Sequence, residues 1–455
     1  MANKESVVEQ LKEEIRKRMP KSGEINRRAQ QIYPHGEISA ARDFDPWPFY
    51  ATKGEGAYIW DIDGNRYLDC CMCYGVALLG HRPPPIIKAM KEHLERQPLH
   101  YGAPLPGEVD WGEKFVKCVP CAERVVLCNT GNEAVHKSVN IARAATGRDK
   151  IAKFEGGFHG SNEYSLWSVH ANPELMGPPQ RPNPVPSVPG MPRAAKDAIV
   201  LLPFREESAF EIIEENAADL AVVMIEPIFG AGGVLSPGKE FLQKLREVTK
   251  RNNVLLLFDE IITGFRLGLG GGQEYFDVTP DMGLFGKSLG GGMPIGAIGC
   301  SQEIIDKVLD LEPPLLVAGT FSGNATTLAA SNAMLDYLME NSPALQNDLA
   351  ARGDYLRSSF NDFTKAKGMP STMIGDASMW GLHMAEPPVE TPRDCLKSDM
   401  EIVAELGLRL RLEGIFLPGE LHGGFLSTAH GDEEVEEMLR ALKAVLEACF
   451  SGRKI

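Results

Sequence analysis

The sequence predicts an α/β protein with a mainly parallel sheet, and two observations lead to this class. Short runs such as 221–225 and 254–258 are apolar throughout, which is typical of strands covered on both faces. Helical stretches such as 132–146 and 238–251 lie between these runs, so strand and helix alternate as in βαβ units. Further strands are expected at 125–128, 151–154, 198–202 and 282–285.

The two ends of the chain depart from this alternation. Residues 6–33 have a helical pattern, and residues 57–69 have the pattern of a hairpin with Asp63-Gly64-Asn65 at its turn. The character changes again after residue 325, where helices are expected at 325–339, 349–367 and 433–450 and strands at 379–384 and 414–417. We therefore predict a central domain at 76–325 and a C-terminal domain at 326–455, with an N-terminal segment, 1–75, that packs near the latter.

Composition excludes several classes of partner. The chain has 455 residues, 47 basic and 62 acidic side chains and a net charge of −15, which argues against nucleic acid and against an anionic membrane surface. No apolar run approaches the roughly 20 residues of a membrane span, and the charged N-terminus is unlike a signal peptide. Nine cysteines without a paired framework indicate reduced thiols in the cytoplasm. Cys118 and Cys121 lack a second ligand pair, so no metal site is predicted.

Three motifs follow expected strands, where open α/β sheets bind ligands. Thr130-Gly131-Asn132 opens a helix and suits a phosphate, although a plain N-cap has the same pattern. Asp259 ends a buried strand, either as a cap or as the partner of a protonated ring nitrogen. Lys287 lies in a Gly-rich turn, either as a surface lysine or as a desolvated nucleophile. Together they form the three contacts that pyridoxal 5′-phosphate requires.

Longer motifs extend this combination. They are Phe258 to Arg266 (FDEIITGFR), Gly286 to Pro294 (GKSLGGGMP), Gly319 to Asn324 (GTFSGN), Gly80-His81 and Phe154-Glu155-Gly156. In this order the chain resembles the class III pyridoxal-phosphate aminotransferases, and among them the glutamate-1-semialdehyde 2,1-aminomutases. The resemblance implies fold type I, with a seven-stranded, mainly parallel sheet in a large domain and a smaller α+β domain.

The resemblance also implies roles for the residues at the cofactor ring. Lys287 would form the Schiff base and move a proton between carbons, and Asp259 would hold the pyridinium proton. Phe158 occupies the position of the stacking aromatic residue, which is usually tyrosine, and His159 follows it. Ile261 would press on the opposite face of the ring.

The phosphate contacts are carried over in the same way. Thr130, Gly131 and Asn132 match the family's Ser-Gly-Thr. Thr320 would reach the phosphate of a neighbouring subunit, so the resemblance implies a homodimer with the cofactor at its interface.

The substrate side departs from the family pattern. Ser39 and Arg42 match positions that hold a substrate carboxylate in the aminomutases. Tyr74 replaces a tryptophan, His422 replaces a glutamate, and 415–430 lacks the arginine that many aminotransferases use for an oxo-acid acceptor. A carboxylate substrate still fits, whereas glutamate-1-semialdehyde fits less well.

Several reactions remain open from the sequence. The first expectation is transfer of an amino group between a carboxylate-bearing amino compound and a carbonyl acceptor. An intramolecular aminomutase reaction is the alternative, and an amino-acid racemase or epimerase is a third. The proline-rich stretch 172–192 lies where the aminomutases have a mobile lid, which would retain an intermediate.

Overall fold

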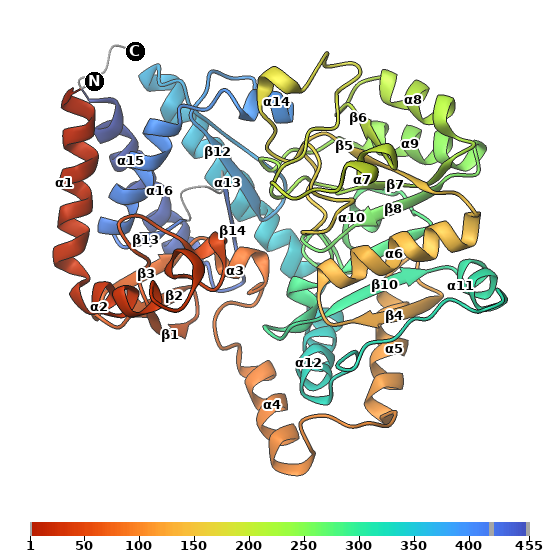
Figure 1. The fold of residues 1–455 in the computed structure, drawn as a ribbon. Helices are drawn as coiled ribbons and strands as arrows, with labels where there is room; N and C mark the ends of the chain where they lie inside the picture. The colour runs from red at the N-terminus through yellow and green to blue at the C-terminus, as the bar shows by residue number, and fades with distance from the viewer. Residues whose placement is uncertain (1, 418–422, 452–455) are drawn as a thin grey trace. The chain divides into compact units, whose positions relative to one another are not determined.

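The computed structural model describes residues 2–417 and 423–451, which fold into two compact units (Figure 1). The large unit consists of Pro84–Asp348 and Glu390–Leu396, and the small unit consists of Met1–Pro83, Leu349–Val389 and Lys397–Ile455. These limits differ from the expected boundaries at 75 and 325. The chain stays in the large unit beyond residue 325 because helix α12 (Ala325–Asn341) packs on α4 (Pro84–Arg96) and α5 (Pro106–Cys118).

The large unit is built around a seven-stranded sheet with strand order β4-β10-β9-β8-β7-β5-β6. Neighbouring strands from β9 to β6 are parallel, and β10 runs antiparallel to both of its neighbours. The strands are β4 (Arg124–Cys128), β5 (Lys150–Phe154), β6 (Ile199–Leu202), β7 (Leu220–Ile225), β8 (Leu255–Asp259), β9 (Met282–Phe285) and β10 (Gly296–Cys300).

Six of these strands lie where the apolar runs predict them, whereas β10 was not predicted. Its sequence, Gly-Ala-Ile-Gly-Cys, contains two glycines and has low strand propensity. Tertiary packing explains the glycine at 299, because a Cβ there would lie 2.9 Å from the Ala122 side chain. The close contact with Ala122 therefore requires glycine at 299, and this glycine weakens the strand pattern of the sequence.

Helix α6 (Gly131–Thr146) packs on the sheet through its apolar stripe. Val135, Val139 and Ile141 are fully buried and share a core cluster with Met224 of β7 and Leu284 of β9. The other helices of this unit are α7 (Arg193–Asp197), α8 (Ser208–Asn216), α9 (Lys239–Arg251), α10 (Gly271–Phe276), α11 (Gln302–Leu309) and α14 (Pro392–Cys395), with 3₁₀ turns η3 (Pro173–Leu175) and η4 (Lys287–Gly290).

The small unit joins both ends of the chain through its sheets. Strand β13 (Ile415–Phe416) pairs in parallel with β3 (Arg66–Asp69), next to the antiparallel pairs that β3 makes with β2 (Tyr58–Asp61) and β2 with β1 (Ala51–Glu55). A second, antiparallel sheet has the order β11-β12-β14. Its strands are β11 (Thr372–Ile374), β12 (Met379–His383) and β14 (Gly423–Phe425).

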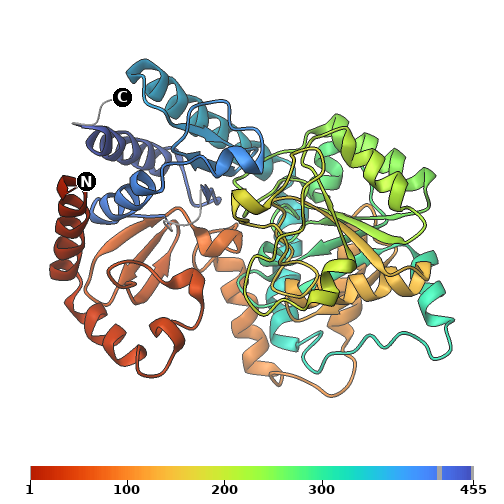
Figure 2. The same ribbon diagram turned by 45° about the horizontal axis from the view of Figure 1, so that its top comes forward.

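The N-terminal helical stretch is two helices rather than one. Helix α1 (Ala2–Arg18) ends before Met19, and α2 (Pro20–Ala29) starts at Pro20, because proline is accommodated at the first position of a helix but not in its interior. Helix α1 packs beside α15 (Met400–Leu412), as Figure 2 also shows. The remaining elements of this unit are η1 (Pro34–Gly36), η2 (Ala40–Arg42), α3 (Met72–Gly75), α13 (Ala344–Lys367, mostly in this unit) and α16 (Asp432–Phe450).

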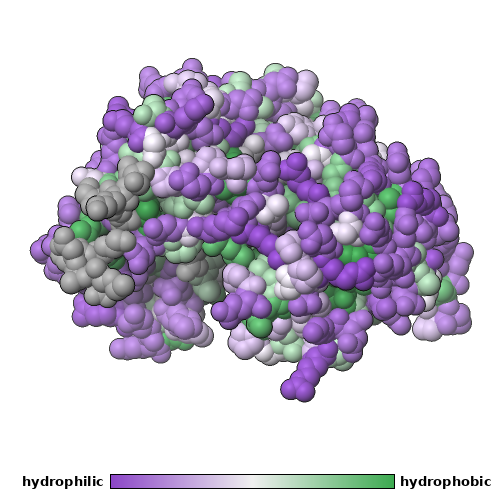
Figure 3. All heavy atoms as spheres, turned by 90° about the horizontal axis from the view of Figure 1, so that it is seen from above, coloured by the Kyte–Doolittle hydropathy of each residue, from purple (hydrophilic) through white to green (hydrophobic). Residues whose placement is uncertain are grey.

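Charged and polar residues cover most of the face seen from above in Figure 3, and apolar residues form small separate areas there. Among the described residues, no helix has the length and apolar character needed to cross a membrane.

Candidate active site

The site residues of the large unit lie just beyond the carboxyl ends of its strands. Asp259 ends β8, Glu226 follows β7 directly, and Lys287 follows β9 after one glycine. Thr130 comes two residues after β4, which also runs parallel to β9 because two successive antiparallel pairings separate them. Parallel strands end at the same edge of a sheet, so these side chains gather there.

A buried hydrogen bond joins His159 to Asp259. Asp259 Oδ2 lies 2.8 Å from His159 Nδ1, and both side chains are almost completely buried. Burial lowers the pKa of the His159 imidazole, so the neutral ring donates from Nδ1 to the carboxylate. Asp259 Oδ1 accepts the backbone N–H of Ile261 at 3.1 Å. The carboxylate is thus fixed in position, and its remaining lone pairs are available to a ring N–H.

Glu226 holds the backbone beside this pair. Its Oε1 accepts the N–H of Phe158 at 2.8 Å, and its Oε2 accepts the N–H of Gly230 at 3.0 Å. Burial, and then the negative charge of Asp259, raises the pKa of Glu226 to about 8, while the charge of Lys287 opposes the shift. Glu226 therefore positions Phe158, whose side chain is 39% exposed and can lie against a bound ring.

A buried lysine, Lys153, lies on β5. Lys153 Nζ donates to the carbonyls of Ser165, at 2.9 Å, and Trp167, at 2.5 Å. Burial lowers the pKa of Lys153 to about 7, and the charge of Glu226 opposes this shift. Lys153 thus ties the segment that follows His159 to strand β5.

Lys287 occupies a strained position. Its φ is +43°, in the left-handed region that L-residues other than glycine seldom adopt. It starts the turn η4, whose next residue, Ser288, is fully buried and donates its hydroxyl to the carbonyl of Gly264 at 3.0 Å. Strain of this kind persists only where the surroundings enforce it, and it is common at functional sites.

The amino end of α6 provides free N–H groups. Thr130 caps the helix through Oγ1, which accepts the N–H of Glu133 at 3.2 Å. Within the described chain, the N–H groups of Gly131 and Asn132 have no acceptor, as expected in a first helical turn. A Cβ at Gly131 would lie 2.8 Å from Ile261 Cδ1, so only glycine keeps this approach open. The side chain of Asn132 accepts the N–H of Ser161 at 2.9 Å.

The proline-rich stretch 172–192 belongs to the large unit and packs against neighbouring residues of that unit. Met176 and Val185 are buried together with Ala171, and Ser187 donates its N–H to the carbonyl of Leu166 at 2.9 Å. Arg393 binds both carboxylate oxygens of Glu155, at 2.8 and 3.0 Å.

The same guanidinium also donates to the carbonyl of Gly177 at 2.9 Å. One arginine thus ties this stretch to the end of β5.

The predicted substrate residues belong to the small unit. Ser39 and Arg42 are exposed, and Arg42 ends the short turn η2. Tyr74, in α3, donates its hydroxyl to the carbonyl of Ala41, the neighbour of Arg42. These three residues therefore lie together, whereas His422 is outside the described residues.

Thr320 is exposed in the large unit. Its carbonyl accepts from His100 Nε2 at 2.7 Å, and no hydrogen bond of its hydroxyl is found within the described chain.

Two observations show that the residues of the large unit suit pyridoxal phosphate. His159 Nε2 is buried without a partner among the described residues, beside a carboxylate with free lone pairs. The glycine at the start of α6 keeps N–H groups accessible to a phosphate. Asp259 and Lys287 would contact the ring, and Gly131 and Asn132 the phosphate.

Sequence reasoning missed Glu226, Lys153 and the pair between Arg393 and Glu155 as parts of this site. Glu226 carries the same signal as Asp259, a carboxylate directly after an apolar strand, and could have been found by it. Arg393 lies 238 residues from its partner and has no local signal.

Comparison with known proteins gives consistent results. The family model for class III aminotransferases matches residues 39–419. Glutamate-1-semialdehyde 2,1-aminomutase of Methanothermobacter thermautotrophicus is 37% identical over 428 residues, which are 94% of this chain and 99% of that protein.

Solved structures include an omega-transaminase from Sphaerobacter thermophilus, with a TM-score of 0.88, 33% identity and coverage of 94% of this chain and 97% of that one. A beta-phenylalanine aminotransferase from Variovorax paradoxus has a TM-score of 0.87 and 27% identity, with 99% of each chain covered.

Proposed function

The chain belongs to the class III aminotransferase family, and we propose that it transfers an amino group from a carboxylate-bearing amino compound to a separate carbonyl acceptor. It is a pyridoxal-phosphate-dependent enzyme with the fold of that family. The observation that supports amino-group chemistry, which transfer and isomerisation share, is the arrangement at the carboxyl edge of the sheet, where Lys287 follows β9 and the buried pair of Asp259 and His159 follows β8 and β5.

Each residue of this edge has a distinct task in the proposal. When bound, pyridoxal phosphate supplies an electron sink for the carbon that carries the amino group. Asp259 holds a proton on the ring nitrogen, because its buried negative charge favours the protonated form. His159 keeps that carboxylate oriented, and Lys287 Nζ takes and returns the proton at the substrate carbon.

The substrate carboxylate is assigned to Arg42. Its planar guanidinium can bind both oxygens of a carboxylate, and its charge is solvent-accessible in the small unit. Ser39 donates an additional hydroxyl, and Tyr74 shapes the same region from α3. His422 is included in this group as a proposal from the sequence alone.

Transfer between two substrates requires the first product to leave before the acceptor binds. A small buried core and the Arg393 contacts hold the 172–192 stretch against neighbouring residues of the large unit.

The intramolecular aminomutase reaction is the second candidate. The 37% identity with an aminomutase over almost the whole chain favours it, together with Ser39 and Arg42. The two reactions share Lys287 and Asp259, so these residues cannot distinguish them.

A panel experiment separates the candidates. The holoenzyme is incubated with α-amino acids, β-amino acids, simple amines and glutamate-1-semialdehyde, each with and without a 2-oxo acid, while the cofactor form and the products are followed. Transfer predicts that the cofactor stops in its amino form without an acceptor and that an oxo acid restores turnover. Complete isomerisation of glutamate-1-semialdehyde without an acceptor would establish the mutase instead. Inversion of an amino acid without any exchange of the amino group would establish an epimerase.

A homodimer is part of the proposal. Leu99, Leu316 and Phe321 expose 65%, 85% and 61% of their surface, and Phe321 lies against His100 near Thr320. A second copy would cover these apolar side chains and receive Thr320 at its phosphate site. Sedimentation equilibrium tests the dimer, and a monomer at assay concentration would refute it.

We also propose a cytoplasmic location. All nine cysteines are free thiols, and eight of them are buried, which is typical of a reducing compartment.

A further inference from the structure

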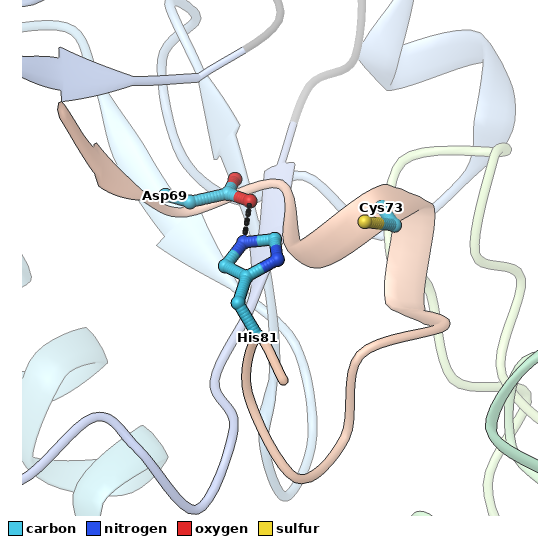
Figure 4. Close-up of side chains that lie close together, drawn as sticks. All are labelled: Asp69, Cys73 and His81. Atoms are coloured by element: carbon cyan, nitrogen blue, oxygen red, sulfur yellow. Dashed lines mark hydrogen bonds and ion pairs between the residues drawn. The ribbon is translucent and has the colours of Figure 1, made fainter. Parts of the chain in front are cut away.

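Three residues with metal-binding side chains meet in the small unit, outside the proposed cofactor contacts. Asp69 ends β3, Cys73 lies in α3, and His81 follows twelve residues after Asp69. One ligand atom from each lies within 4.8 Å of the other two. Figure 4 shows the Cys73 sulfur directed toward the pair that Asp69 and His81 form.

The Asp69 carboxylate is rigidly oriented. Its Oδ1 accepts the backbone N–H groups of Cys71 and Met72 at 2.8 and 2.9 Å, and its Oδ2 lies 2.8 Å from His81 Nε2. Asp69 is 2% exposed, so this orientation is protected from solvent. Backbone donors that fix a carboxylate in this way are typical supports of a metal ligand.

An unusual turn brings Cys73 to this pair. Met72, Cys73 and Tyr74 have φ values of +45°, +55° and +58°, and Gly75 follows at +89°. A left-handed conformation costs about 1–2 kcal/mol for each residue other than glycine. The bonds to Asp69 Oδ1, and the N–H that Tyr74 donates to Cys71 Sγ at 3.3 Å, offset part of this cost. Strain over three successive residues indicates that the position of Cys73 matters.

Cys73 differs from the other cysteines. It is the exposed one of the nine, and among the described residues neither its sulfur nor His81 Nδ1 has a hydrogen-bond partner. Partial burial of the sulfur, and then the Asp69 carboxylate, raise the pKa of the Cys73 thiol to about 11. Without a metal, the sulfur is therefore a neutral thiol at neutral pH.

We propose that Asp69, Cys73 and His81 bind a divalent cation of the zinc class, with a fourth position open to water. Carboxylate, thiolate and imidazole together are the donors that Zn²⁺ and Cd²⁺ prefer, whereas Mg²⁺ and Ca²⁺ prefer oxygen donors alone. Neighbouring ligands of a tetrahedral Zn²⁺ with 2.0 Å bonds are about 3.3 Å apart, so the oxygen and nitrogen at 2.8 Å are already close to bonding positions. The Cys73 sulfur lies within 4.8 Å of the ligand atoms of the other two residues, so it must move closer to them to complete the set.

The binding step releases one proton. The Cys73 S–H bond breaks as the sulfur–zinc bond forms, and that proton goes to solvent. The metal also replaces the hydrogen bond between Asp69 Oδ2 and His81 Nε2, and the proton of Nε2 is exchanged through solvent to Nδ1, so that the imidazole stays neutral. The competing explanation is an ion pair of purely structural importance, which requires no participation of the sulfur.

Zinc binding to the holoenzyme distinguishes the two explanations. Equilibrium dialysis against Zn²⁺ compares the wild type, Cys73→Ser and, as the matched control, Cys118→Ser, whose buried thiol lies on α5 of the large unit. We expect the wild type and Cys118→Ser to bind one Zn²⁺ per chain more than Cys73→Ser. Titration with Cd²⁺ should give a thiolate-to-metal absorbance in the same two proteins only, while Mg²⁺ should not compete.

Two results would overturn the site. Equal zinc binding by the wild type and Cys73→Ser would exclude the cluster as a site for this cation. Lower binding in Cys73→Ser without a thiolate absorbance in the wild type would exclude the sulfur as a ligand. The comparison does not depend on the amino-transfer reaction, and circular dichroism of Cys73→Ser checks that the variant is folded.

Discussion

The proposed cofactor residues and the proposed substrate residues are held in opposite ways. In the large unit, Asp259, His159 and Glu226 are buried, and their positions are fixed by hydrogen bonds of 2.8–3.1 Å. In the small unit, Ser39 and Arg42 are exposed on a short turn. A reaction common to a family needs fixed charges, whereas a substrate preference can change through exposed side chains with few structural constraints.

The largest effect is expected from removing the charge of Asp259. Asp259→Asn retains the size of the side chain but can no longer stabilise a ring proton, so kcat should fall by about 10²–10³-fold. Steady-state kinetics measure this fall, and Asp277→Asn, an exposed aspartate of the same unit, serves as the control. A loss below tenfold would show that the buried charge is not needed for the reaction.

The next largest effect is expected from removing Arg393, which ties the 172–192 stretch to Glu155. Arg393→Ala leaves the Glu155 carboxylate buried without its partner, so the free energy of unfolding should fall by about 3 kcal/mol. Arg181→Ala removes an exposed pair with Glu215 and should cost less than about 1 kcal/mol. Urea unfolding compares the two variants. Equal losses would mean that burial does not distinguish the two arginines.

Glu226 should make stability depend on pH. Its pKa is about 8 in the folded protein, above the ordinary value of 4.5, so the folded state retains a proton that the unfolded state has lost. Stability contributed in this way falls as pH rises from about 5 to 7, by at most about 1.4 kcal/mol per unit. The pKa of Lys153 is about 7 instead of 10.5, so the contribution of Lys153 makes stability rise with pH, and it does so only above about pH 7.

The variant Glu226→Gln isolates this contribution. Urea unfolding at several pH values between about 5 and 7 should give a flatter profile than the wild type. Identical slopes would show that Glu226 is ionised in the folded protein throughout that range.

The smallest effect is expected from removing the exposed Arg42 of the small unit. Arg42→Ala should raise KM for carboxylate substrates by about tenfold, because a charged hydrogen bond contributes about 1.5 kcal/mol or more. Simple amines should be nearly unaffected, and Arg28→Ala, another exposed arginine of the small unit, should change neither. Equal increases for both substrate types would refute the role of Arg42.

Local sequence patterns predicted the residues at strand ends, but not those whose place depends on contacts between distant segments. Asp259 and Lys287 were identifiable because Asp259 ends an apolar strand and Lys287 comes two residues after one, and the end of a strand fixes a position in space. Strand β10 was missed because the glycine at 299 is explained by contact with Ala122, not by local propensity. Cys73 and His81 could not be paired, since left-handed backbone at three non-glycine residues has no sequence pattern.

We propose that Lys287 binds the cofactor covalently at the edge of the sheet. The most direct measurement is the visible absorbance of the holoenzyme compared with Lys287→Ala and with Lys239→Ala, an exposed lysine of the same unit. We expect that Lys287→Ala, although folded and supplied with pyridoxal phosphate, lacks the Schiff-base absorbance and has no amino-transfer activity, while Lys239→Ala retains both. Schiff-base absorbance or turnover that persists in Lys287→Ala at the wild-type level would contradict it.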